Sequence, residues 1–130
     1  MREHVRDKGR LEDIRHYSEI AESIAKGMSY NDFVNDVRSY YAVMKTVEIV
    51  GEAAYMLTKE FKDAHPDTPW DIIQGMRHIL VHGYANVNAS TLYETTINNI
   101  PELRKQVEKY LEETDWEMWA NVTTARTTSR

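Results

Sequence analysis

The stretch that decides the fold reads VMKTVEIVGEAAYMLTKEF and runs from Val43 to Phe61. Apolar residues recur within it at alternating spacings of four and three, which is the seam pattern of a helix packed in a bundle. These residues are Val43, Val47, Val50, Ala54, Leu57 and Phe61. The pattern predicts one long helix that ends before Pro66, because proline lacks the amide hydrogen that a helix interior needs.

Helical periodicity also precedes this stretch. Apolar residues three and four positions apart predict a first helix from Leu11 to Met28, with Gly27 marking its end. Ser29 and Asp32 then flank Tyr30, which is typical of the start of a short helix. The N-terminal half is therefore expected to contain two long helices and a short one between them.

Two further helices are expected after the long helix that contains Val43–Phe61. Thr68-Pro69-Trp70-Asp71 has a capping hydroxyl, a proline at the first helical position and an acid in the first turn. This fourth helix should end at Gly83. Asn88 or Ser90 is expected to cap the last one, which Pro101 should kink or split.

The expected fold is all-α: an antiparallel bundle of four long helices plus a short one, because no window alternates long enough to form a strand. Residues 1–114 are assigned to this domain, and residues 115–130 to a partly disordered C-terminal tail. Trp116 and Trp119 in the tail either dock a partner or fold back onto their own bundle.

Composition limits the possible functions. The chain has 130 residues, a formal net charge of −5 and no cysteine, which excludes disulfides and thiolate metal sites. No apolar run approaches the roughly 20 residues that span a bilayer, so we expect a cytoplasmic protein without membrane contact. The acidic balance argues against broad nonspecific binding to nucleic acid, but it allows a local basic cleft.

The residues best suited to chemistry form the pattern R-x4-H-x-Y, made by Arg77, His82 and Tyr84. Arg77 is the only Lys or Arg between Lys62 and Arg104. On a regular helix Arg77 and Tyr84 share a stripe, whereas His82 lies about 140° from Arg77. Either the helix end unwinds at Gly83, or two copies of the helix meet across a two-fold axis, with Gly75 allowing a close approach.

Such a group is suited to cleaving RNA without a metal or other cofactor. Histidine supplies a base whose pKa is near neutrality, and a guanidinium fits phosphate oxygens bidentately. The attacking 2′-hydroxyl belongs to the RNA, so no protein nucleophile is required.

Each residue also has a simpler explanation. Arg77 could be an interface arginine paired with a carboxylate from another helix. Glu48 and Glu52 could pair with it or line the cleft, but a solvated face is the default for both. His82 alone would be an ordinary histidine at a helix end, and Tyr84 a packed aromatic. His78 and His82 are one turn apart and could chelate a metal, but no third ligand is evident.

Taken together, several segments between residues 5 and 113 resemble the HEPN superfamily of small helical ribonucleases. Within this superfamily the chain resembles the HepT toxins, which are encoded beside a minimal nucleotidyltransferase antitoxin, MntA. The segments are Val50–Ala54, Pro69–Ile73, the Gly75-Met76-Arg77 lead-in, the R-x4-H-x-Y block and Ile100–Leu103.

The resemblance implies a homodimer whose facing motifs form one composite, metal-independent RNase site. Arg77 and His82 would be the catalytic pair, and Tyr84 the tyrosine that the nucleotidyltransferase antitoxin modifies with AMP. His78 occupies a position that is often Asn in the family, so it would either donate a hydrogen bond or share in proton transfer. The expected function is thus a toxin endoribonuclease acting on RNA. The alternatives are a non-catalytic HEPN module that binds a nucleotide or partner, and a metal-binding bundle.

Overall fold

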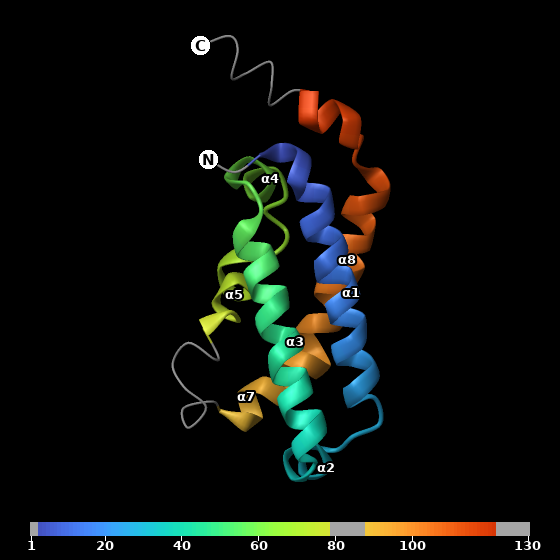
Figure 1. Cartoon of the computed structure of the whole chain (residues 1–130), viewed down its shortest axis with the longest axis vertical. Helices are drawn as coiled ribbons and strands as arrows, with labels where there is room; N and C mark the ends of the chain where they lie inside the picture. The colour runs from blue at the N-terminus through green and yellow to red at the C-terminus, as the bar shows by residue number, and fades with distance from the viewer. Residues whose placement is uncertain (1–2, 79–87, 122–130) are drawn as a thin grey trace.

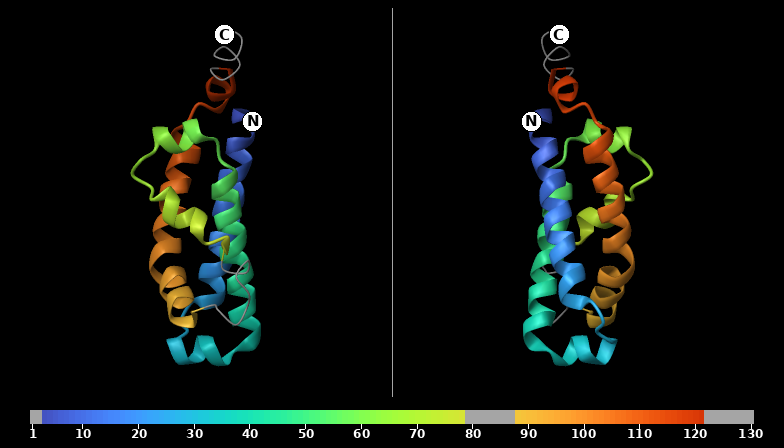
Figure 2. Two further views of the ribbon diagram at one scale, coloured as in Figure 1. Left: turned by 90° about the vertical axis from the view of Figure 1, so that its left-hand side faces the viewer. Right: turned by 90° about the vertical axis from the view of Figure 1, so that its right-hand side faces the viewer.

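The computed structural model describes residues 3–78 and 88–121, and every regular element within them is a helix (Figure 1). Three helices form the frame: α1 (Asp7–Ala25), α3 (Val37–Met56) and α8 (Ile100–Glu113). α1 packs against both α3 and α8 and runs antiparallel to each of them (Figures 1 and 2). The predicted all-α class is confirmed, whereas the number of long helices and the dimer remain predictions.

Shorter elements connect this frame. They are η1 (His4–Arg6), α2 (Tyr30–Asn35), α4 (Lys59–Ala64), α5 (Trp70–Gly75), α7 (Ala89–Glu94) and the π-helical η3 (Thr95–Asn99). Gly27 has a φ of 75°, which turns the chain after α1 as expected. Ser29 caps α2 through a capping box, because its hydroxyl accepts from the amide of Asp32 and its own amide donates to the Asp32 carboxylate.

The long helix predicted to run through Phe61 ends earlier. α3 stops at Met56, Leu57 is extended, and the hydroxyl of Thr58 caps α4 by accepting from the amide of Phe61 at 3.2 Å. Asp7, which is buried, stabilises this break because its carboxylate accepts from the amide of Thr58 at 2.9 Å and from its hydroxyl at 2.6 Å. Leu57 and Phe61 are nevertheless fully buried, so the apolar pattern predicted their burial correctly and the helix's continuity wrongly.

The last helical segment, over residues 89–113, is continuous but contains a π-helical turn just before Pro101, where the sequence predicted a kink or a split. Asn88 caps α7 by accepting from the amide of Thr91 at 3.1 Å. The π-helical turn η3 then precedes α8, which carries Pro101 in its first turn. Proline cannot donate to the carbonyl four residues before it, and the wider turn accommodates this missing hydrogen bond.

The two tryptophans of the tail fold onto their own bundle. They lie in a short helix over residues 116–121 and pack against the core, where both rings contact that of Phe61. The indole of Trp119 donates a hydrogen bond to the carboxylate of Asp7 at 2.9 Å. Its ring stacks on that of His4, with 4.6 Å between the ring centroids. Trp116 and Trp119 are therefore packed on the domain, as one of the two alternatives predicted, while residues 122–130 lie outside the description. None of the helices described here is long and apolar enough to cross a membrane.

Candidate functional site

The segment that carries Arg77 begins differently from the sequence expectation. Thr68 does not cap the helix, because its hydroxyl is hydrogen-bonded to Tyr110 at 2.6 Å and to Gln106 at 2.9 Å. α5 instead starts at Trp70, after Pro69, with no side-chain cap. The predicted cap is wrong because a tertiary hydrogen bond uses the same hydroxyl.

Arg77 lies in a turn after α5 and not within a continuous helix. The amide of Met76 donates to the carbonyl of Ile73 at 3.1 Å, and that of Arg77 to the carbonyl of Gln74 at 3.3 Å. This spacing of three residues is the tighter hydrogen bonding of a 3₁₀ turn. The angles expected on a regular helix through Arg77 therefore do not apply across this point.

A glycine on α3 allows the turn to approach closely. A Cβ added at Gly51 would lie 2.4 Å from the amide nitrogen of Arg77 and 2.9 Å from the Cβ of Met76. Gly51 is thus the residue that lets the backbone at Arg77 press against α3. Gly75, which was expected to allow close approach of a second copy, has no described atom within 4 Å of a Cβ added to it.

The guanidinium of Arg77 rests on an aromatic ring and has no ion-pair partner in the described ranges. Its Cζ lies 3.8 Å from the ring centroid of Tyr55, one turn after Gly51 on α3. Its Nε is buried and has no hydrogen-bond partner among the residues that the structure describes. No carboxylate of residues 3–78 or 88–121 comes within ion-pair distance of it, so the pairing with Glu48 or Glu52 is not observed.

Arg77 also lines a cavity of about 380 Å³ beside α1 and α3. The other lining residues are Arg10, Asp13, Lys45, Glu48, Ile49, Glu52, Ala53 and Met56. Basic and acidic side chains are equally numerous there, and Lys45 is bound to Glu48 at 2.7 Å. The cavity is therefore not a uniformly basic groove, and its capacity to hold an anion depends on cations that no carboxylate engages.

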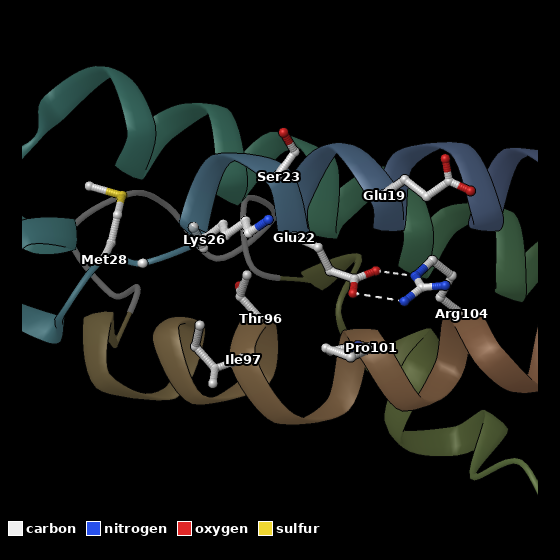
Figure 3. Close-up of a pocket in the computed structure, with 11 residues that line it drawn as sticks. Glu19, Glu22, Ser23, Lys26, Met28, Thr96, Ile97, Pro101 and Arg104 are labelled. Carbon is white, nitrogen blue, oxygen red and sulfur yellow. Dashed lines mark hydrogen bonds and ion pairs between the residues drawn. The ribbon is translucent and has the colours of Figure 1, made fainter.

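A larger cavity of about 600 Å³ lies between the end of α1 and the η3–α8 segment, and its arginine is engaged differently (Figure 3). Arg104 donates two hydrogen bonds to Glu22 and one to Glu108, the last at 2.7 Å. The hydrogen bond to Glu22 raises the pKa of Arg104 further. Because these carboxylates already compensate its charge, this arginine is a poorer ligand for an added phosphate than Arg77 is.

Of the other predicted site residues, the structure describes only His78. His78 directly follows Arg77 and is half-buried. His82 and Tyr84 lie outside the described residues, so their positions relative to Arg77 stay predictions. The part of the chain that the structure describes contains no group of three His, Cys, Asp or Glu side chains arranged to hold a metal ion.

Sequence reasoning missed the support that α3 gives to Arg77. The available signal was Gly51 at an interior helix position, where glycine costs roughly 0.5–1 kcal/mol relative to alanine. Such a residue indicates a close contact. Tyr55 lies one turn later and therefore faces the same side of the helix.

Comparison with known proteins adds a family relationship. A family model described as "Ribonuclease HepT-like" matches residues 14–110. A relative from Caldanaerobacter subterraneus subsp. tengcongensis, named as a candidate RNase, is 42% identical over 102 residues, which are 78% of this chain and 91% of the relative. A protein of Thermococcus cleftensis, named probable ribonuclease HepT, is 35% identical over 78% of this chain and 93% of its own. No solved structure matches the chain significantly.

Proposed function

The chain belongs to the HepT-like ribonuclease family of the HEPN superfamily, and on this premise we propose that it is a metal-independent endoribonuclease acting as the toxin of a toxin–antitoxin pair. The observation that carries the proposal is the state of Arg77. Its guanidinium lines a cavity, rests on Tyr55 and has no described carboxylate partner. A guanidinium in this state remains available to a phosphate.

In the proposed reaction the 2′-hydroxyl of the RNA attacks the adjacent phosphorus. His82 accepts the proton from that hydroxyl, and a histidine donates one to the departing 5′ oxygen. The products are a 2′,3′-cyclic phosphate and a 5′-hydroxyl, so no water or metal enters this step. Arg77 stabilises the negative charge that develops on the phosphorane oxygens. His78 would either donate a hydrogen bond or share in proton transfer.

The site is proposed to form between two copies of the chain in a cytoplasmic homodimer. One base and one acid are both needed, and a two-fold axis would supply two histidines and two arginines from a single motif. The proposed partner is a minimal nucleotidyltransferase antitoxin of the MntA kind, which would attach AMP to Tyr84. The added phosphodiester is negatively charged and would compete with RNA phosphate for Arg77.

The decisive experiment incubates the purified protein with single-stranded RNA in the presence of EDTA. We expect cleavage that leaves 2′,3′-cyclic phosphate ends, and we expect its loss in His82→Ala and Arg77→Ala. Arg38→Ala serves as the control, because Arg38 is an exposed arginine outside the cavity. Cleavage that requires an added divalent metal, or full activity of His82→Ala, would contradict the mechanism. If no RNA is cut while Arg77→Ala weakens binding, the chain is a non-catalytic binding module.

A further inference from the structure

A second arginine lines the cavity of Arg77, and we propose that this residue, Arg10 of α1, binds an RNA phosphate next to the one under attack. The inference rests on the proposed function for its substrate class, single-stranded RNA. Arg10 and Arg77 come from segments far apart in the sequence, yet both line the same cavity of about 380 Å³. The fold thus places two guanidiniums around one space.

Neither guanidinium has a carboxylate partner among the described residues, in contrast to Lys45 in the same cavity and Arg104 in the larger one. No described carboxylate lies within 4.0 Å of the nitrogens of either Arg10 or Arg77. Lys45 in the same cavity is held by Glu48, and Arg104 in the larger one by Glu22 and Glu108. A phosphate can therefore bind Arg10 and Arg77 without first displacing a described carboxylate.

The acidic residues of the cavity indicate how RNA would be held there. Asp13 and Glu52 also line it and are exposed, so they lower the local positive potential without forming ion pairs in the described ranges. RNA would be held by two directional guanidinium contacts and not by a general excess of positive charge. It follows that removing the charge of Asp13, one turn from Arg10 on α1, should strengthen RNA binding.

The test measures binding of single-stranded RNA as a function of salt concentration, in a His82→Ala background so that the RNA stays intact. Each phosphate contact contributes about 0.7 to the slope of log affinity against log salt for a single strand. We expect Arg10→Gln to lower the slope by about that amount and to weaken binding by about tenfold. Arg10→Lys should retain the slope, and Asp13→Asn should bind more tightly than the parent.

Arg15→Gln is the matched control. Arg15 lies on the same helix, has no ion pair with a described carboxylate and does not line the cavity, since five residues correspond to about 140° of rotation. An Arg10→Gln variant that loses no more slope than Arg15→Gln would overturn the proposal, because the effect would then be general electrostatics. An unchanged affinity in Asp13→Asn would likewise count against an RNA-occupied cavity.

Cleavage by the protein with an intact His82 separates this inference from the function on which it rests. If the parent cuts RNA and Arg10→Gln raises KM while kcat is unchanged, the ribonuclease function and the phosphate contact of Arg10 are both supported. If the parent cuts RNA and Arg10→Gln leaves KM and the salt slope unchanged, only the role of Arg10 fails. If no cleavage occurs but binding still depends on Arg10, the proposed ribonuclease fails and the phosphate site remains.

Discussion

The guanidinium carbon of Arg77 lies 3.8 Å from the ring centroid of Tyr55. α3 therefore supports Arg77 in two ways, because Gly51 admits its backbone and Tyr55 holds its side chain one turn later. A cation–π contact contributes about 0.5–1 kcal/mol at exposed sites and about 2 kcal/mol when desolvated. With Nε buried, the arrangement fixes the position of the guanidinium before any ligand arrives.

Replacing the ring under Arg77 should reduce catalysis more than it reduces stability. We expect Tyr55→Leu to lower kcat/KM by about tenfold, which corresponds to about 1.4 kcal/mol of lost positioning of the guanidinium. Tyr55→Phe keeps an aromatic face and should stay close to the parent. Steady-state cleavage kinetics measure both, and equal activities of the two variants would contradict a positioning role for the ring.

Gly51→Ala should destabilise the protein although alanine favours helices. Its Cβ would lie 2.4 Å from the amide nitrogen of Arg77, so α3 and the turn must separate, at a cost of about 1–3 kcal/mol in the free energy of unfolding. Gly9→Ala is the matched control, since Gly9 lies in α1 with nothing within 4 Å of the added Cβ.

We expect Gly9→Ala to raise the free energy of unfolding by about 0.5–1 kcal/mol in the same urea titrations. Effects of the same sign at Gly9 and Gly51 would show that the contact with Arg77 does not limit substitution. The displaced turn should also reduce RNA cleavage by Gly51→Ala.

The two tail tryptophans should contribute unequally to stability. Trp119→Phe removes a hydrogen bond to the buried carboxylate of Asp7, and we expect the free energy of unfolding to fall by about 1.5–3 kcal/mol. Trp116→Phe makes the same change in side-chain size but loses only a hydrogen bond to the carbonyl of Leu111. Denaturant titrations of the two variants compare them directly, and equal losses would argue against a special role for the charged acceptor.

Stability should depend on pH through Glu60. The hydrogen bond from His4 lowers the pKa of Glu60 below its ordinary value of 4.5, so the folded state favours the ionised carboxylate. This contribution is complete above the unfolded pKa and is lost as the pH falls through the lower folded value. Glu60→Gln should therefore be less stable than the parent near neutrality, and the difference should shrink in acid.

Urea midpoints from about pH 3 to about pH 7 test this dependence. Glu112→Gln is the control, because Glu112 is exposed and forms no ion pair with a residue of the described ranges. If the stability difference between the parent and Glu60→Gln grew as the pH fell, the pKa of Glu60 would be raised by folding and not lowered, which would contradict this prediction.

Much of the secondary structure could be predicted because its causes are local. The Ser29 and Asn88 caps and Gly27 all act within about one helical turn, and the two helix starts and the turn that depend on them lie where the sequence predicts. The isolated Arg77 also stood out from sequence alone, because a single cation in an apolar stretch is conspicuous.

What only the tertiary structure decided depends on partners far away in the chain. The helix through Leu57 is broken because Asp7, fifty-one residues away, accepts the hydrogen bonds of Thr58, and Thr68 bonds to Tyr110 instead of capping α5. Periodicity cannot reveal such pairs, since it records only neighbours within a few residues. Arg77 could be identified from the sequence because its isolation among apolar residues is a local feature. Gly51, Tyr55 and Arg10 could not be assigned to it, because only the packing of α1, α3 and the turn after α5 brings them close to Arg77.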